Sequence, residues 1–521
     1  MSAAPQMMTE SEPAPRATTD LDHEVVIVGS GFSGLGAARA LQKIGIQDFV
    51  ILERESELGG TWVQHDYPGL EVDMPFFIYS YPSEMKPDWS QVYPTGKEMR
   101  EYTRDVARKW DLVRRTRCNA TVERAEYDAD ANVWRIRLEG GEEIATRYLV
   151  SATGLLVLPK MPDIEGIDGF EGKIIHTARW DWDYDLTGKR VAVIGTGATG
   201  IQIIPAIADQ VEHLDVYQRT AIWLLPKPNP KLSRAAQQIL GVAPFLQVIV
   251  RWLINLFVEL SMGLGMVHYK RFPWIFDWIE KKAVQQIRDV VDDPETAEKL
   301  IPDYSFFCKR PSFSNRYFQC FNRPDVELIT EPIDRVSGKS VVTRDGKERE
   351  VDVLICATGY NVFNRKCVPG YELIGRDGAD LGEFWEKNRY QAYEGATVPG
   401  FPNLFLFMGP YSAAGASYFT MIDVESKHMT RCLLEARKRG ADYIEVKQSA
   451  HDRDFEKVKR RKDSTVLFAG SCSTANSYYF DNHGDTPGLR PVSGFEHWLN
   501  SRLFSLKDYV FQKRARSGRA G

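Results

Sequence analysis

The chain has 521 residues, of which 43% are hydrophobic and 26% are charged. This length exceeds what one hydrophobic core usually organises, so we expect two or more globular domains rather than a fibrous or disordered chain. The formal net charge is −5, from 66 basic and 71 acidic residues, and a chain without a basic excess lacks the electrostatic signature of nucleic-acid binding.

Cysteine usage and the N-terminal segment indicate the cellular compartment of the protein. The seven cysteines are odd in number and include no C-x-x-C pair, so a disulfide framework, a zinc ribbon and a redox dithiol are all disfavoured, and no metal site is expected. Residues 1–21 lack the apolar core of a signal peptide and are expected to form a disordered leader. These observations together favour a reducing cytoplasm.

The first chemical motif is a glycine-rich loop after a short β-branched run at 25–28. The run is typical of a buried parallel strand, and a helical pattern and a second strand ending in an acid follow the loop. In such a loop the glycines allow a tight turn and close approach to a pyrophosphate, the helix N-terminus attracts the phosphates, and the acid binds a ribose hydroxyl. The pattern predicts a dinucleotide site that contains Gly29, Gly31, Phe32, Ser33, Gly34 and Glu53.

Two further patterns separate this unit from the next. Gly59-Gly60-Thr61-Trp62 is followed by Tyr67-Pro68-Gly69 and Asp73; a simple turn would explain the glycines of the first group but not the residues after them. After a predicted hairpin at 121–138, the stretch 170–181 matches F-x-G-x-x-x-H-x-x-x-W-D without a gap. The matching residues are Phe170, Gly172, His176, Trp180 and Asp181.

A second glycine-rich loop follows another buried strand, 188–194, and predicts a second dinucleotide site. The next strand, 214–218, ends in Arg219 and Thr220 instead of an acid. An acid there favours a free 2′-hydroxyl whereas an arginine accommodates a 2′-phosphate, so this unit is predicted to bind NADPH and the first unit FAD. A strand followed by Ala-Thr-Gly closes both units, which indicates an internal repeat. The loop residues of the second site are Gly195, Gly197, Ala198, Thr199 and Gly200.

The second unit contains an unusual insert at 231–301. Its apolar part, 239–267, is interrupted at every fourth residue by a polar side chain, and these four side chains would share one helical face. A buried helical subdomain over the NADPH site is favoured. The alternative is a helix in a membrane interface, which three tryptophans suggest and the few basic residues on the polar face weaken. No run of eighteen uncharged apolar residues occurs, so a spanning helix is not expected. The polar residues are Gln247, Arg251, Asn255 and Glu259, and the tryptophans are Trp252, Trp274 and Trp278.

Lys309-Arg310-Pro311 completes a set of motifs within a stretch of about 24–511. The set consists of the 170–181 stretch with Gly-Thr-Trp, Tyr-Pro-Gly and Lys-Arg-Pro, and it resembles the fingerprint of type I Baeyer–Villiger monooxygenases, which are class B flavoprotein monooxygenases. The resemblance implies an α/β fold of two Rossmann-like dinucleotide-binding domains, for FAD and NADPH, with a helical insert in the second. It also implies insertion of one oxygen atom from O2 next to a ketone carbonyl, through a flavin C4a-peroxide, to give an ester or lactone.

The resemblance implies boundaries and roles as well. We expect the first part of the FAD domain at 22–158, the linker motif and NADPH domain at 159–360, and a return to the FAD domain with a C-terminal cap at 361–521. Arg310 would be the fixed cation beside the flavin, and Asp73 would orient it. His176 would govern the arrangement of the domains. Many family members have a tryptophan where Tyr478 stands, and that tryptophan contacts the NADP ribose. The sequence does not decide whether Tyr478 makes the same contact. The remaining implied contacts are Gly60, Thr61, Trp62, Asp73, Tyr79 and Val122 for FAD, and Lys309 and Arg310 for NADP.

Three other functions share parts of this pattern. A flavin-containing monooxygenase that oxygenates nitrogen or sulfur has both nucleotide folds, but the Trp180-Asp181 ending and Lys309-Arg310 argue against it. A disulfide reductase would need a dithiol, and a non-catalytic redox sensor would bind FAD without oxygen transfer. The sequence assigns neither the ketone nor the oligomeric state.

Overall fold

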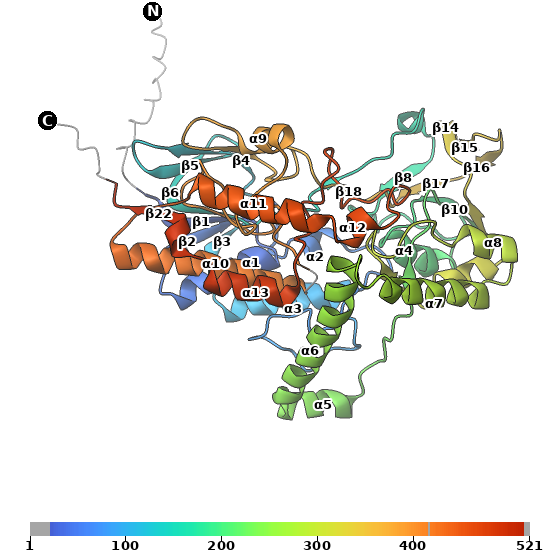
Figure 1. Ribbon diagram of the computed structural model, residues 1–521. Helices are drawn as coiled ribbons and strands as arrows, with labels where there is room; N and C mark the ends of the chain where they lie inside the picture. The colour runs from blue at the N-terminus through green and yellow to red at the C-terminus, as the bar shows by residue number, and fades with distance from the viewer. Residues whose placement is uncertain (1–20, 415–416, 515–521) are drawn as a thin grey trace, which may run out of the picture.

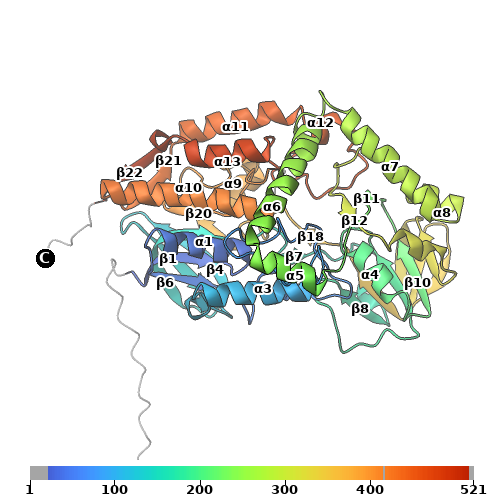
Figure 2. The same cartoon turned by 90° about the horizontal axis from the view of Figure 1, so that it is seen from below.

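The computed structural model describes residues 21–414 and 417–514, in which two large sheets lie side by side with helices packed around them (Figures 1 and 2). The predicted leader lies outside the described residues except for Leu21. The two sheets with helices on their faces confirm the predicted α/β class, and each sheet is built around one of the two glycine-rich loops.

The first sheet has the strand order β19-β4-β5-β6-β1-β2-β3, and β20 also pairs with β6. The central strand β1 runs parallel to β2 and β6, and its residues Val25, Val26 and Ile27 are fully buried, as the β-branched run predicts. The predicted hairpin is the antiparallel pair β4 and β5. The strands are β1 His23–Val28, β2 Phe49–Leu52, β3 Thr116–Arg117, β4 Val122–Asp128, β5 Val133–Leu138, β6 Glu143–Ser151, β19 Glu372–Ile374 and β20 Leu404–Leu406.

The second sheet is parallel throughout, with the order β13-β10-β9-β17-β8. In both sheets the strand before the glycine-rich loop lies between the next strand in sequence and a later one, so each loop lies where the strand order reverses. Such a switch point is where parallel sheets bind ligands. The strands are β8 Lys173–His176, β9 Arg190–Ile194, β10 His213–Tyr217, β13 Val326–Ile329 and β17 Val353–Cys356.

The chain passes between the two sheets twice, and the two crossings pair with each other. β7 (Leu158–Pro159) on the outward crossing and β18 (Tyr360–Asn361) on the return form an antiparallel ribbon. The 170–181 stretch follows the outward crossing and supplies β8, the edge strand of the second sheet. There Gly172 passes so close to the chain before β17 that a Cβ atom would lie 2.4 Å from the Asp352 carbonyl oxygen.

Helices cover the first sheet on the side of the C-terminal segments. α1 (Phe32–Lys43) packs along α10 (Tyr418–Arg439), and α13 (Gly494–Leu503) packs on α10 in turn (Figure 2). The larger remaining elements are α3 Gly96–Lys109, α4 Gly200–Ile207, α9 Leu381–Asn388, α11 Gln448–Lys462, β21 Tyr443–Val446 and β22 Tyr509–Gln512. The short ones are α2 Thr61–Gln64, η1 Val113–Arg115, η2 Ile167–Gly169, β11 Leu224–Leu225, β12 Ser312–Phe313, η4 Phe318–Asn322, β14 Ile333–Ser337, β15 Ser340–Thr343, β16 Glu348–Glu350, α12 Val466–Ala469 and η5 Leu506–Asp508.

The insert is helical, but the prediction that it is a buried subdomain holds for only part of it. The π-helical segment η3 and helix α7 place Met266, Val267 and Phe276 in a buried cluster with Trp223 and Phe306. By contrast, α5 and α6 stand out from the lower side of the molecule in Figure 1, and most of their apolar side chains are exposed. The insert helices are α5 Arg234–Val242, α6 Pro244–Val258, η3 Glu259–Val267, α7 Trp274–Val290 and α8 Pro294–Lys299.

Cys308 and Cys472 form a disulfide, which the sequence did not predict, while the other five cysteines are free. Their Cα atoms lie 5.1 Å apart although 164 residues separate them in the sequence. Neither the number nor the spacing of cysteines reveals a pair that only folding brings within bonding distance. Cysteine usage therefore no longer favours a reducing compartment.

Candidate active site

The two glycine-rich loops repeat one set of close backbone contacts. Gly29 has a φ of +102° and Gly195 a φ of +106°, and a Cβ atom on them would lie 2.5 Å and 2.6 Å from the carbonyl oxygens of Ala152 and Ala357. These alanines begin the two Ala-Thr-Gly sequences. Since only glycine combines this backbone conformation with this approach, the first glycine of each loop is fixed by the strand beside it.

The second glycine of each loop faces open space or another glycine. A Cβ atom on Gly197 would have no neighbour within 4 Å, and one on Gly31 would meet only the Cα of Gly60, at 3.6 Å. Backbone left uncovered at this point is what a dinucleotide pyrophosphate needs in order to approach the helix N-terminus. The two loops therefore fit FAD and NADPH by geometry as well as by sequence.

The acid of the first loop is held in place by a residue that the sequence did not single out. Glu53 Oε2 accepts hydrogen bonds from the backbone N–H and the hydroxyl of Ser30, at 2.9 Å and 2.6 Å. Ser30 is fully buried and Glu53 is 6% exposed. The predicted ribose-binding carboxylate thus lies against the loop that is predicted to bind the pyrophosphate. Val122 packs in the same core as Val28 and Leu52, at the ends of the two strands that carry the loop and the acid.

Three of the residues predicted to contact FAD form an aromatic wall. The Tyr79 ring lies 6.2 Å from that of Phe32 and 5.9 Å from that of Trp62, both at steep angles. Burial raises the pKa of the Tyr79 phenol, and the negative charge of Asp73 adds to the rise. This places Tyr79 beside the charged pair that follows.

Arg310 and Asp73 form an ion pair across 237 residues of sequence. Arg310 donates from Nε at 2.9 Å and from Nη2 at 2.6 Å, and both bonds go to Asp73 Oδ2. The carboxylate holds the pKa of Arg310 well above its ordinary value. Because the Arg310 side chain remains 45% exposed, its other N–H donors are directed away from Asp73 and can reach a bound molecule.

A loop near the C-terminus joins the Arg310 region to the segment after β10 that carries Thr220. Tyr478 and Tyr479 lie close enough to Arg310 to add to the rise of its pKa, and Asn476 Nδ2 donates to Thr220 Oγ1 at 2.8 Å. Tyr478 therefore lies at the Arg310 end of this loop, and Asn476 touches the end predicted to hold the NADP ribose. Sequence reasoning had singled out Tyr478 and missed Asn476, which stands in no motif.

Two cations meet where the 2′-phosphate of NADPH is expected. Burial, together with the positive charge of nearby Arg219, lowers the pKa of Lys309 to about 8. Two neighbouring cations that repel each other are relieved by an anion between them, and a phosphate would supply two negative charges. This donor set fits NADPH better than NADH.

The affinity for NADPH is accordingly expected to depend on pH through Lys309. A bound phosphate stabilises the protonated lysine, so this contribution is complete below about pH 8 and is lost as the pH rises above that value. The KM for NADPH should rise above pH 8 by up to about tenfold per pH unit. Steady-state kinetics from pH 6 to 10 would measure this rise. Lys309→Met should have a higher KM that no longer changes over this range; an identical pH profile in the variant would contradict the assignment.

The Tyr-Pro-Gly motif lies at the contact between the two sheets. A Cβ atom on Gly69 would lie 2.7 Å from the Gln202 carbonyl oxygen in α4, and the Tyr67 phenol hydrogen-bonds to the Thr199 side chain. Nearby, the buried Lys227 pairs with Glu71 at 2.5 Å. This motif therefore positions the second glycine-rich loop against the first domain.

The linker motif is held by local contacts around the crossing. Lys173 and Asp181 form an ion pair at 2.5 Å, and His176 Nδ1 accepts from the Ala178 N–H at 3.1 Å. Burial lowers the pKa of His176. His65, which the sequence did not point to, hydrogen-bonds to Tyr360 of the ribbon at 2.8 Å, and burial lowers its pKa to about 4. His176 is thus placed to affect the domain crossing, and its role stays a prediction.

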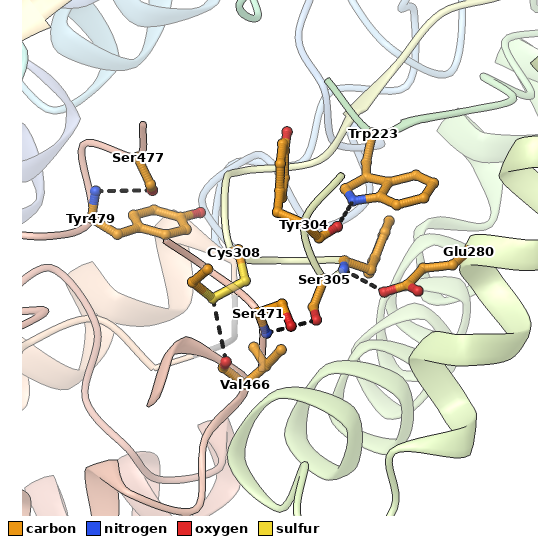
Figure 3. The surroundings of a disulfide bond; sticks show 11 residues. Trp223, Glu280, Tyr304, Ser305, Cys308, Val466, Ser471, Ser477 and Tyr479 are labelled. Atoms are coloured by element: carbon orange, nitrogen blue, oxygen red, sulfur yellow. Dashed lines mark hydrogen bonds between the residues drawn. A yellow bond between two sulfur atoms is a disulfide. The ribbon is translucent and has the colours of Figure 1, made fainter. Parts of the chain in front are cut away.

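The disulfide fixes the segment just before Lys309 and Arg310 (Figure 3). Ser305 and Ser471 flank it with two hydrogen bonds of 3.0 Å, one from each backbone N–H. On the other side, the Glu280 side chain accepts from the Phe306 N–H at 2.6 Å. The loop that carries Tyr478 and the segment that carries Arg310 are therefore tied together.

Comparison with known proteins supports both the fold and the chemistry. A family model described as pyridine nucleotide-disulphide oxidoreductase matches residues 26–240. A Baeyer-Villiger monooxygenase of Pseudomonas aeruginosa is 35% identical over 93% of this chain and 88% of its own length. One from Streptomyces coelicolor is 34% identical over 93% and 92%.

Solved structures agree over nearly the whole chain. The crystal structure of OTEMO with FAD and NADP has a TM-score of 0.84 and 26% identity, and it covers 95% of this chain and 100% of its own. Oxidised steroid monooxygenase bound to NADP has a TM-score of 0.81 and 29% identity, with 94% and 100% covered. Both cofactors predicted for this chain occur together in the first of these structures.

Proposed function

The chain belongs to the Baeyer–Villiger monooxygenases, and we propose that, with FAD and NADPH bound, it inserts one oxygen atom from O2 next to the carbonyl of a ketone to give an ester or lactone. It is an NADPH-dependent flavoprotein monooxygenase. The ion pair of Arg310 and Asp73 is the observation that carries the proposed reaction. Tyr79 lies between Asp73 and Phe32 of the first loop, and the segment with Asn476 and Tyr478 lies between Arg310 and Thr220. Of the three other functions weighed above, oxygenation of nitrogen or sulfur is the nearest, and these relatives do not favour it.

The chain's own residues divide the work of binding and positioning. The loop of Gly29 with Glu53 would hold FAD, and the loop of Gly195 with Arg219 and Lys309 would hold NADPH. Bound together, the two cofactors supply the electrons and activate O2. Tyr79 and Trp62 form the aromatic wall on the FAD side.

Arg310 supplies a permanent positive charge. Oxygen insertion passes through anionic species, and an arginine stays protonated at every pH at which the protein is folded. Asp73 fixes two of its five donors and so directs the remaining ones. Because the pair is assembled by the fold, no reorganisation is needed during reaction.

The proposed reaction is tested by aerobic NADPH turnover of the FAD-loaded protein with linear, cyclic and aryl ketones. Products are identified by mass spectrometry. An ester or lactone one oxygen atom heavier than its ketone is expected. Oxygenation of amines or sulfides in place of every ketone would overturn the proposal, as would stable FAD binding without any NADPH oxidation.

A further inference from the structure

Helix α6 buries its polar face and exposes its apolar face, which is the reverse of an ordinary surface helix. Its polar residues Gln247 and Arg251 are buried, whereas the apolar side chains of its other face point away from the protein. Six of them, between 48% and 70% exposed, form what we call the apolar ridge: Phe245, Ile249, Trp252, Leu253, Leu256 and Phe257. A surface helix normally buries such a stripe, and an exposed one of this size indicates an apolar partner.

Buried hydrogen bonds hold the helix in this orientation. Arg251 Nη1 donates to the carbonyl oxygens of Phe77 and Ser80, at 3.0 Å and 2.9 Å. Burial lowers the pKa of Arg251 to about 10, so its side chain is still a cation at neutral pH. Turning the ridge inward would leave this cation and two carbonyl groups without partners. The outward direction of the ridge is therefore a fixed property of the fold.

Exposed basic residues lie on both sides of the ridge along the sequence. Between residues 231 and 282 the exposed charged side chains are six bases and one acid, Asp277, in a chain whose net charge is −5. In the described part of the chain, none of the six bases has an ion-pair partner. They lie at the start of α5, after η3 and on α7, and are Lys231, Arg234, Lys270, Arg271, Lys281 and Lys282. This local excess of positive charge favours an anionic partner.

Exposed tryptophans extend the surface onto α7. Trp274 is 65% and Trp278 61% exposed, and Figure 2, seen from below, shows α5, α6 and α7 on the same side of the molecule. Tryptophan is the residue most typical of the boundary between lipid head groups and acyl chains. The consecutive helices α5 to α7 thus carry exposed apolar side chains, tryptophans and bases, the combination found in helices that lie in a membrane interface.

We propose that the apolar ridge and its basic surroundings bind the surface of an anionic membrane, with α6 lying in the plane of the head groups. The ridge would enter the acyl boundary, and the six bases would contact anionic head groups. This inference does not depend on the ketone reaction.

The same observations disfavour a second copy of the chain and a spanning helix. A twofold dimer would place the same basic residues opposite each other, which is repulsive. Pro244–Val267 is long and apolar enough to cross a membrane, with a mean hydropathy of 1.5 and 12% of its most apolar window buried. However, Arg251 is bonded within the first domain, so crossing would require those bonds to break.

The test is flotation of the full, FAD-loaded chain with lipid vesicles. Binding is expected to vesicles of phosphatidylcholine and phosphatidylglycerol in equal parts, and binding to phosphatidylcholine alone should be much weaker. Trp252→Ser/Phe257→Ser should reduce the bound fraction at least about tenfold, because two large apolar side chains are lost from the contact. Lys281→Glu/Lys282→Glu should weaken binding to the anionic vesicles selectively.

Matched controls use exposed residues elsewhere. Val113→Ser removes an exposed apolar side chain, and Lys339→Glu/Lys347→Glu reverses two exposed charges in the loops of the three-stranded sheet of β14, β15 and β16; both should bind like the wild type. Unchanged FAD content in every variant shows that the fold is intact. The proposal is overturned if the wild type stays with the soluble fraction, if the ridge variant binds equally well, or if the ridge variant instead converts a dimer into a monomer. Bound protein that high salt and alkaline carbonate cannot release would also overturn it, in favour of a spanning helix.

Discussion

Replacing Arg310 with alanine is expected to lower ester or lactone formation by about 10²–10³-fold while NADPH still reduces the bound flavin. The variant lacks the permanent cation that would stabilise the anionic species of oxygen insertion, but it keeps both glycine-rich loops and the aromatic wall. Stopped-flow absorbance under anaerobic conditions would measure flavin reduction, and product analysis under air would measure oxygen insertion.

Two further variants separate the charge of Arg310 from its orientation. Arg310→Lys keeps a cation but loses the fork that places two donors on Asp73 Oδ2. Asp73→Asn keeps the arginine and weakens the bond that orients it. Both should fall between the wild type and Arg310→Ala in ester yield. An ester yield in Arg310→Ala equal to that of the wild type would show that the cation has no part in oxygen insertion.

Replacing Arg490 with methionine is expected to lower the free energy of unfolding by about 3–5 kcal/mol. Arg490 is fully buried, and its Nη2 lies 2.9 Å from Glu394 Oε2 and 2.5 Å from Asp454 Oδ1. Burial raises the pKa of Glu394. Burial acts in the same direction on Asp454, but the attraction and hydrogen bond of Arg490, the Glu394 N–H and the charge of Lys457 together outweigh it and lower the pKa. Without the arginine, two carboxyl groups would remain buried close together with no cation between them.

Urea unfolding, followed by tryptophan fluorescence and by FAD release, would measure the loss of stability. The urea concentration at the midpoint is compared between variants, because a chain of this size need not unfold in one step. The control is Arg490→Met/Glu394→Gln/Asp454→Asn, which removes all three charges and should recover part of the lost stability. Equal midpoints for the wild type and Arg490→Met would mean that the buried carboxyl groups are stabilised in some other way.

The parts of the site that depend on short continuous stretches were predictable from the sequence. The glycines of the first loop, the acid at Glu53 and the arginine at Arg219 all stand in local strand-loop-helix patterns of a few dozen residues, and those patterns were enough to identify them. The pairing of Arg310 with Asp73 spans 237 residues. It could be expected only because the motifs around both residues resemble those of a known family.

Features without a motif could not be predicted in this way. The four-residue spacing of Gln247 and Arg251 correctly identified one face of a helix, but not the direction in which that face points. The usual rule buries the apolar face, and here the carbonyl groups of Phe77 and Ser80, more than 170 residues earlier, reverse it. The disulfide and the contact of Asn476 with Thr220 likewise depend on distant loops meeting.

The Cys308–Cys472 bridge also changes the covalent topology of the protein. The backbone from 308 to 472 becomes a closed ring that contains β17 of the second sheet, the returning strand β18, and β20 of the first sheet. The loop with Tyr478 is consequently tethered beside Arg310 and is present there at a high effective concentration. A molecule that binds beside Arg310 therefore meets a loop whose start is covalently held at Cys472, six residues before Tyr478.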